Sequence, residues 1–226
     1  MSWQIDYKKK LRTPEEALRC VTSGMRVYIQ PGCAEPETLV EALMKRGPFV
    51  EDVEIVHMMT MGTAPYVAPE MAGHFRHNAI FIGANVRDAI NEGRADYTPI
   101  YLSEIEELFT SGAMPLDVAL VQVSPPDSHG FCSFGVGIDT TLTAAHQARF
   151  VVAQVNDQMP RTYGDSYIHV NDLDMVVESS RPLCAMKKRE VTDLDIAIAY
   201  NVASLIEMGR CSRPGSGAFP TQFCRC

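Results

Sequence analysis

Short apolar segments alternate with helical segments along most of this sequence, and this alternation limits the fold more than any other feature does. The segment Val118 to Val123 is apolar at alternate positions, which is typical of a strand buried on both faces. Consecutive parallel strands need crossover connections, and these are usually helices. The alternation therefore predicts the α/β class, with a mostly parallel sheet that carries helices on both faces.

The expected elements extend from residue 13 to residue 207. Thr13-Pro14-Glu15-Glu16 combines a capping hydroxyl, a proline and a glutamate in the order that begins a helix. Further helices are expected over residues 37–44, 86–92, 103–111, 140–147 and 193–207. Strands are expected over residues 25–30, 53–58, 79–82, 98–101, 118–123 and 150–155, with a sheet edge through 167–170 and 175–177.

The composition indicates a globular protein without a nucleic-acid partner. The 226 residues are 46% hydrophobic, and the net charge of -8 lacks the basic bias that nucleic-acid binding needs. No apolar run approaches the roughly 20 residues that cross a bilayer, and no apolar stretch follows the basic N-terminal residues. We therefore expect a cytoplasmic protein with no membrane partner. Cys20, Cys33, Cys132 and Cys184 stand far apart, which is typical of reduced thiols.

Ligands of open α/β sheets bind beyond the carboxyl ends of the strands, which directs attention to three loops. These loops are residues 31–36, 58–66 and 124–137. The third contains two prolines and three glycines, and glycines let backbone amides approach a ligand closely. An ordinary glycine-rich connection has the same composition, so both interpretations stay open at this point. The three methionines of the second loop fit a pocket wall and core filling equally well.

The polar residues of the chain do not predict a catalytic triad or a metal site. Asp127, His129, Cys132 and Ser133 lie within one loop, but no G-x-S-x-G elbow accompanies them. His74 and His77 are three residues apart, yet no other histidine or cysteine has a matching spacing for a metal. We expect no metal and no catalytic residue from these patterns, and we expect Asp127 to cap its own turn.

Four separated motifs occur in one order along the chain. They are QPGCAEP at residues 30–36, EMAGHFRHN at 70–78, NEGRADYTP at 91–99 and SPPDSHGFCSFGVG at 124–137. Together they closely resemble the acetyl-CoA hydrolase/transferase family, within which the 4-hydroxybutyrate and butyrate CoA-transferases look most similar. The resemblance runs from about residue 10 to about residue 207 and covers the family's N-terminal domain.

The resemblance implies a CoA-transferase-type domain of an enzyme that moves coenzyme A between an acyl-CoA and a short-chain carboxylate such as acetate, butyrate or 4-hydroxybutyrate. In the family, a glutamate of the second domain attacks the thioester and becomes a glutamyl-CoA thioester. Its motif has no counterpart here, so no catalytic residue is assigned and this chain alone is expected to be inactive. Coenzyme A is a substrate and no cofactor is expected to be bound, while intact members are expected to be homo-oligomers. An acyl-CoA hydrolase and a non-catalytic remnant are the alternatives.

The resemblance also places candidate site residues. The acyl side of the cleft is expected to be lined by two loops, with Gln30, Pro31, Gly32, Ser124, Pro125, Gly135 and Gly137 as its residues. The register of the family's CoA-binding loop is occupied by Gly215, Ser216, Gly217 and Ala218.

The resemblance divides the chain into an N-terminal domain at residues 1–207 and an aberrant tail at residues 208–226. Three of the seven cysteines lie in this tail, and residues 219–226 lack helical periodicity. One plausible codon choice for residues 219–224, read from one base earlier, encodes Leu-Pro-Asp-Ala-Val-Leu, which resembles a helix start of the family. We hypothesise that a frameshift created the tail at the start of the missing C-terminal domain.

Overall fold

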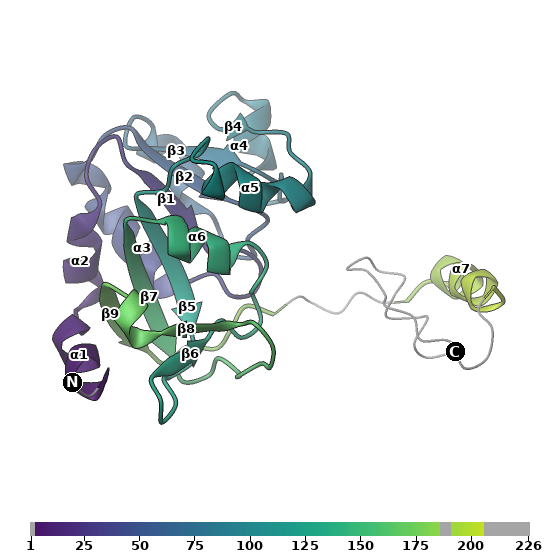
Figure 1. The fold of residues 1–226 in the computed structure, drawn as a ribbon. Coiled ribbons are helices and arrows are strands. Elements are labelled where there is room, and N and C mark those ends of the chain that lie inside the picture. The colour runs from purple at the N-terminus through teal and green to yellow at the C-terminus, as the bar shows by residue number, and fades with distance from the viewer. Residues whose placement is uncertain (1–2, 186–190, 206–226) are drawn as a thin grey trace. The chain divides into compact units, whose positions relative to one another are not determined.

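The chain divides into two compact units, Met1–Ala185 and Met186–Cys226. The computed structural model describes residues 3–185 and 191–205 (Figure 1). The first unit contains all of the strands that the structure describes, and the second contributes one helix, α7 (Asp193–Ala203). None of the described helices is long and apolar enough to cross a membrane.

A parallel sheet of seven strands forms the centre of the first unit. Its strands stand in the order β4-β3-β2-β1-β5-β7-β9. Every neighbouring pair in this sheet is parallel, which confirms the predicted α/β class. The strands are β1 (Arg26–Ile29), β2 (Val53–His57), β3 (Phe75–Ala79), β4 (Asp96–Tyr97), β5 (Val118–Val123), β7 (Phe150–Asn156) and β9 (Met175–Ser179).

Two short strands lie outside the parallel sheet. β6 (Phe131–Ser133) pairs antiparallel with β8 (Tyr167–His169). The segment 167–170 was expected at a sheet edge, but its partner is β6, and the edge of the main sheet on this side is β9. β6 is absent from the prediction because three residues between glycines carry too short an alternation to indicate a strand.

Helices cover both faces of the sheet, as predicted (Figure 1). α2 and α3 contribute to one apolar core, and α5 and α6 contribute to a second core. The helices of the first unit are α1 (Trp3–Lys10), α2 (Pro14–Ala17), α3 (Glu37–Arg46), α4 (Arg87–Asn91), α5 (Ile105–Thr110) and α6 (Thr141–Gln147). Short 3-10 turns occur at Leu18–Cys20, Gly47–Phe49, Pro65–Val67, Pro69–Met71, Leu102–Glu104 and Val170–Asp172.

The residues of β5 show how one strand serves both cores. All six are buried, and successive side chains of a strand point to opposite faces of the sheet. Ala119 and Val121 therefore join the core beneath α5 and α6, while Val118 and Leu120 join the core beneath α2 and α3. A strand buried on both faces needs nearly continuous apolar residues, which is the feature that made β5 predictable.

Two predicted strands are wrong in position. The strand expected over 79–82 is β3, which ends at Ala79. The prediction began too late because Arg76 and His77 are polar and do not indicate a buried strand. The strand expected over 98–101 is β4, which ends at Tyr97. Pro99 has no amide hydrogen, so the ladder cannot continue through it. α1 is absent from the prediction because none of its residues is buried and its apolar residues lack helical spacing.

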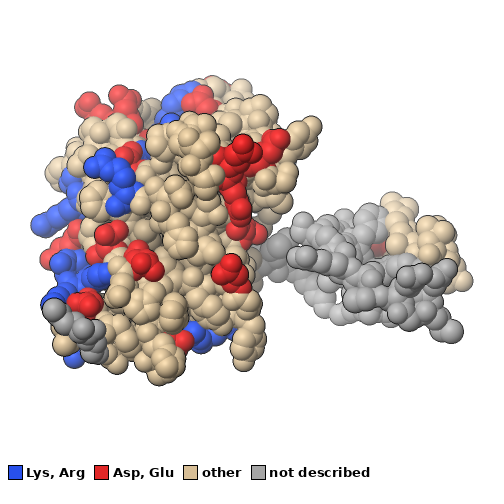
Figure 2. Space-filling view, in the orientation of Figure 1, with Lys and Arg blue, Asp and Glu red and all other residues tan. Residues whose placement is uncertain are grey.

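Charged side chains are unevenly distributed over the face of the first unit that Figure 2 shows. Acidic side chains gather near α5, which carries Glu106 and Glu107 in its first turn. Most basic side chains in this view lie on the side of α1, whose last turn contains Lys8, Lys9 and Lys10, and acidic side chains lie among them. The surface between these two groups is largely uncharged.

Candidate substrate cleft at the carboxyl edge of the sheet

The order of the strands defines one place where a ligand of this fold binds. The strands β2, β3 and β4 follow one another on one side of β1. The strands β5, β7 and β9 follow one another on the other side of β1. The switch between β1 and β5 opens a crevice at the carboxyl ends of these two strands. Gln30 follows β1 and Ser124 follows β5, and Ile29 pairs with Leu120 in the ladder. Two of the predicted cleft residues therefore flank the switch point.

The side chain of Gln30 connects three segments beneath this crevice. It is fully buried, and its amide nitrogen donates a hydrogen bond of 2.6 Å to the carbonyl oxygen of Gly137. Its carbonyl oxygen Oε1 accepts a hydrogen bond from the backbone nitrogen of Gln122 in β5. A single neutral side chain thus fixes the glycine-rich loop to both strands of the switch point.

Three further amide side chains extend this network, and sequence analysis missed all of them. Gln122 Nε2 donates to the carbonyl oxygens of Ala34 and Glu35, both at 3.2 Å. Its Oε1 accepts from Gln154 at 2.9 Å and from Asn156 at 2.8 Å. All three amide side chains are buried, and they hold the loop 31–36 on the ends of β5 and β7. Amide residues at the ends of otherwise apolar strands are the only signal that the sequence offers for this network.

The loops after β1 and β2 are joined directly. Gly32 donates its backbone amide to the carbonyl oxygen of Met59 at 2.8 Å. The carboxylate of Glu35, which is buried, accepts the amide of Gly62 at 2.7 Å. Burial raises the pKa of Glu35, and the hydrogen bond from Gly62 opposes this shift. Pro31 is buried between these contacts. The predicted residues 30–32 are therefore held by hydrogen bonds to neighbouring loops and do not form an open loop.

A buried cluster of two histidines and a tyrosine lies beside the methionine-rich loop. The hydroxyl of Tyr66 donates to Nε2 of His57 at 2.5 Å, and Nδ1 of His57 donates to the carbonyl oxygen of Met58. The ring of His77 stacks on His57 with a centroid distance of 4.1 Å, and its Nδ1 donates to Ile55 at 2.9 Å. Burial lowers the pKa of His57 well below its usual value and that of His77 to about 4, so both rings are neutral at pH 7.

The structure separates the two histidines whose spacing suited a metal. His74 donates its Nδ1 to the carbonyl oxygen of Val50 at 2.8 Å, whereas His77 belongs to the cluster with His57. Within residues 3–185 and 191–205, no group of three or more histidine, cysteine or acidic side chains is arranged to hold a metal ion.

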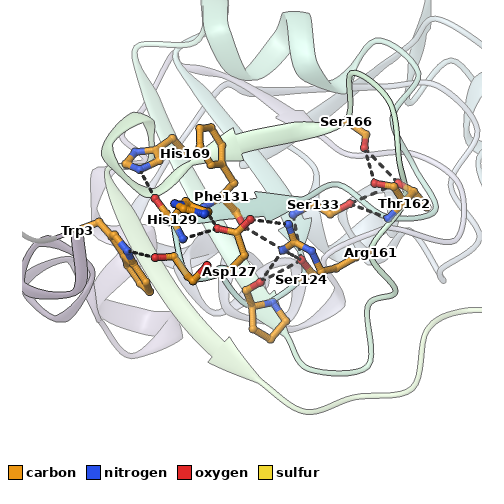
Figure 3. Close-up of polar contacts among 12 residues, drawn as sticks. Trp3, Ser124, Asp127, His129, Phe131, Ser133, Arg161, Thr162, Ser166 and His169 are labelled. Carbon is orange, nitrogen blue, oxygen red and sulfur yellow. Dashed lines mark hydrogen bonds and ion pairs between the residues drawn. The ribbon is translucent and has the colours of Figure 1, made fainter.

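The loop 124–137 is held in place by Arg161 (Figure 3). The guanidinium donates to the carbonyl oxygen of Phe131 at 2.9 Å and to that of Pro125 at 3.3 Å. It also contacts the Ser124 hydroxyl at 3.3 Å and forms an ion pair with Asp127 at 3.1 Å. Arg161 thereby joins both arms of the loop just beyond the end of β5.

The polar residues of this loop support one another rather than forming a nucleophile and its base. Asp127 accepts the amides of His129 at 2.8 Å and Phe131 at 3.0 Å, which confirms that it caps its own turn. These hydrogen bonds, with the nearby Arg161 guanidinium, lower the pKa of Asp127. The Ser133 hydroxyl contacts Thr162 at 3.3 Å and accepts the amide of Gly135 at 3.1 Å.

The glycines at the end of this loop pack against the protein itself. A side chain at Gly135 would collide with the sulfur of Met159, and Gly135 has a positive φ of 61°. A Cβ at Gly137 would lie 2.5 Å from the Cβ of Ala34. Their lack of a side chain is therefore accounted for by close packing, which favours the ordinary-connection interpretation for these two positions.

A pocket of about 580 Å³ lies beside the same edge of the sheet. α1 forms one wall, and the segments after β5, β7 and β9 form the other. Pro125, which was predicted to line the cleft, is exposed in this pocket. Its other lining residues include Trp3, Tyr7 and Glu178, and the Tyr7 hydroxyl donates to Glu178 at 3.0 Å.

The loops that follow β1, β2, β3 and β5 contain no lysine or arginine, and they are residues 30–36, 58–66, 80–85 and 124–137. The segment after β7 contributes Arg161 to this edge, and its guanidinium is paired with Asp127 of the loop 124–137. The predicted CoA-binding residues Gly215, Ser216, Gly217 and Ala218 lie outside the described residues.

Comparison with known proteins agrees with this architecture. Residues 1–186 match the model of the acetyl-CoA hydrolase/transferase N-terminal domain. The chain is 48% identical to the 4-hydroxybutyrate coenzyme A transferase of Clostridium kluyveri over 220 residues, which cover 97% of this chain and 51% of that protein. Among solved structures, RipA from Yersinia pestis has a TM-score of 0.92 and 30% identity over 100% of this chain and 55% of that chain. The 4-hydroxybutyrate CoA-transferase from Porphyromonas gingivalis has a TM-score of 0.85 and 33% identity over 99% and 52%.

The chain spans about half the length of these relatives. The family model covers most of the chain, and the parallel sheet is shared with solved members. The chain belongs to the acetyl-CoA hydrolase/transferase family, and it contains that family's N-terminal domain.

Proposed function

We propose that this chain forms half of the active site of a CoA-transferase that moves coenzyme A between an acyl-CoA and a short-chain carboxylate such as acetate, butyrate or 4-hydroxybutyrate. The observation that carries the proposal is the 48% identity to a 4-hydroxybutyrate coenzyme A transferase over 97% of the chain. The proposal includes a cytoplasmic location, a role in acetate and short-chain fatty acid metabolism, and a homo-oligomeric assembly of the intact enzyme.

The chemistry requires a carboxylate that this domain does not provide. A glutamate of the other half attacks the thioester carbonyl, and the CoA thiolate leaves to give a mixed anhydride. The thiolate then attacks the glutamyl carbonyl, which releases the first acid and forms the glutamyl-CoA thioester. The second acid repeats these steps in reverse order. The overall exchange replaces one thioester by another, so no external energy source is needed.

The contribution of this domain is a fixed wall with exposed apolar side chains. Met59, Phe81 and Val136 are exposed large apolar side chains in or next to the loops at the carboxyl edge. A wall of this kind suits an acyl chain and excludes water, which would otherwise hydrolyse the anhydride. The amide network beneath it keeps the loops in one arrangement.

The test compares the chain with a fusion in which its residues 1–185 precede the C-terminal half of the Clostridium kluyveri relative. With acetyl-CoA and butyrate, the fusion should form butyryl-CoA and a covalent CoA adduct detectable by intact mass. The chain alone should form neither. Butyryl-CoA from the chain alone, at a rate comparable with the fusion, would refute the argument and place the attacking carboxylate within this chain.

The family description names hydrolases as well as transferases, so acyl-CoA hydrolysis is the second candidate. The same fusion distinguishes the two activities. A transferase loses acetyl-CoA only when a carboxylate acceptor is present, whereas a hydrolase releases free CoA without one. Equal rates of acetyl-CoA loss with and without butyrate would assign hydrolysis.

A further inference from the structure

Glu35 is a buried carboxylate that the proposed transfer chemistry does not use. It lies in the loop between β1 and α3, and it is only 3% exposed. The ion pairs of the described residues do not include it. Burial removes the hydration of a carboxylate, and hydrogen bonds must replace it. The groups that hydrogen-bond to Glu35 therefore indicate its role.

The carboxylate of Glu35 lies directly against Gly62 in the loop after β2. Its Oε2 atom accepts the backbone amide of Gly62 at 2.7 Å. A Cβ atom at position 62 would lie 2.5 Å from Oε2 and 2.8 Å from the carboxyl carbon, so only glycine allows this approach. A hydrogen bond from a backbone amide to an ionised carboxylate is among the stronger kinds in proteins. Glu35 therefore fixes the position of this loop from beneath.

The hydrogen bonds of Glu35 continue into a third loop. Its backbone carbonyl oxygen accepts from Nε2 of Gln122 in β5 at 3.2 Å. Asn85, in the loop after β3, donates from Nδ2 to the carbonyl oxygen of Gly62 at 2.9 Å and to the hydroxyl of Thr60 at 3.0 Å. Glu35 thus joins β5 to the loops after β2 and β3.

The two loops that this network holds carry exposed apolar side chains of the proposed acyl wall. Met59 in the loop after β2 is 38% exposed, and Phe81 in the loop after β3 is 54% exposed. A Cβ atom at Gly83 would lie 3.4 Å from Cγ of Met59, so the side chain of Met59 packs along the loop after β3. The position of this wall therefore depends on the network that begins at Glu35.

We infer that Glu35 is a positioning residue, whose ionised carboxylate holds the apolar wall in the arrangement that selects among short-chain acids. The inference rests on the proposed transferase function and deepens it, because it assigns chain-length selectivity to a group beneath the acyl site. Glu35 takes no part in the covalent steps and acts through Gly62 and Asn85. Acetate brings one methyl group to the wall, whereas butyrate brings two methylene groups more. A displaced wall therefore affects butyrate more than acetate.

The role requires Glu35 to be ionised. An ionised carboxylate only accepts hydrogen bonds, whereas protonation removes its charge and weakens the hydrogen bond from the Gly62 amide. Burial raises the pKa of Glu35, and the amide of Gly62 opposes this shift, so protonation begins at a higher pH than for an exposed glutamate. The other ionisable groups around Glu35 are Glu37 with its partner Arg181, Tyr66 and Cys184. Of these, Glu37 adds to the rise.

Nuclear magnetic resonance on the complete chain, labelled at its glycines, tests the contact without any enzyme activity. The amide resonance of Gly62, identified by its loss in Gly62→Ala, should titrate between about pH 8 and about pH 4.5 with a midpoint above 4.5, the usual pKa of a glutamate. Glu35→Gln should abolish this titration. The control Glu51→Gln removes an exposed carboxylate near the amino end of β2 and should leave the titration unchanged. A Gly62 resonance that does not titrate, or that titrates equally in Glu35→Gln, would overturn the inference.

The selectivity of the fusion with the C-terminal half of the relative tests the role of the contact. The ratio of kcat/KM for butyrate to that for acetate does not depend on the amount of folded enzyme, and ionisations that affect both acids equally cancel in it. A methylene group in an apolar pocket is worth about tenfold or more in kcat/KM, so Glu35→Gln should lower this ratio about fivefold or more. Gly62→Ala, whose Cβ displaces the carboxylate, should lower it similarly, and Glu51→Gln should not change it. In the unmodified fusion the ratio should fall as Glu35 takes up its proton, and in Glu35→Gln it should be independent of pH.

The outcomes separate this inference from the proposed function. An active fusion whose ratio is unchanged by Glu35→Gln and by Gly62→Ala would overturn the inference and leave the transferase proposal intact. An unmodified fusion that forms no butyryl-CoA would refute the transferase proposal, and the role of Glu35 in that reaction would fall with it. If Glu35→Gln does not fold, the ratio in Gly62→Ala decides, because that variant leaves the glutamate in place and disturbs the same contact.

Discussion

Acidification should destabilise the first unit through its stacked histidines. His57 and His77 are neutral in the folded protein because burial lowers the pKa of each, to about 4 for His77. In the unfolded chain both rings take up protons near their usual pKa of 6.5. Below pH 6.5 the unfolded state therefore binds more protons, and the free energy of unfolding falls as the pH falls.

The size of the effect follows from the shift at His77. The difference between 6.5 and about 4 corresponds to about 3 kcal/mol of unfolding free energy. Each histidine lowers the free energy of unfolding by up to about 1.4 kcal/mol for each pH unit of acidification. The pair therefore lowers it by up to about 2.7 kcal/mol per unit between pH 6 and 5. Below pH 4 the contribution of His77 becomes constant, because the folded state is then protonated as well. Glu35, whose pKa is raised, opposes this trend as it takes up its proton.

Urea denaturation followed by circular dichroism from pH 7.5 to 4.5, at fixed ionic strength, measures this slope. His77→Asn keeps a donor for the carbonyl oxygen of Ile55 and removes one titrating ring, so the slope should fall by about 1.4 kcal/mol per unit. His146→Asn on α6 is the control substitution, because the side chain of His146 is exposed and the substitution removes no buried ring. Identical slopes for the unmodified chain and His77→Asn would refute the reasoning.

Three further predictions follow from the cleft and the exposed surface. Gln30→Ala should lower the free energy of unfolding by about 3 kcal/mol, because it leaves two buried backbone groups unpaired. The control Gln147→Ala, at an exposed position, should change this free energy by less than about 0.5 kcal/mol. Urea denaturation measures both values. Gly137→Val should cost about 3 kcal/mol by overpacking against Ala34, and a melting temperature within 2 °C (an approximate limit) of the unmodified chain would contradict this. Light scattering should show self-association of the chain at micromolar concentration, and a stable monomer would count against an exposed apolar interface.

The predictable part of this molecule is the part that its local sequence determines. β5 and β7 are apolar on both faces, and the loops after β1 and β5 carry prolines and glycines, so the α/β class and the positions of these two loops after their strands could be predicted. The amide network could not, because Gln122, Gln154 and Asn156 become partners only through the register of β5 and β7. His57, Tyr66 and His77 likewise meet only when β2 and β3 pair. Alternation and turn residues carry no information about such contacts.

The position of Trp3 has a practical consequence for work with this protein. Trp3 is the only tryptophan of the chain, and its indole nitrogen donates to the carbonyl oxygen of Ser128 at 3.1 Å. The tryptophan fluorescence of the unmodified protein, excited selectively over its eight tyrosines, therefore reports from the loop 124–137 without any label. An affinity tag fused to the N-terminus would begin two residues away from this contact, next to the candidate cleft. Preparations intended for substrate titration should carry the tag elsewhere or have it removed.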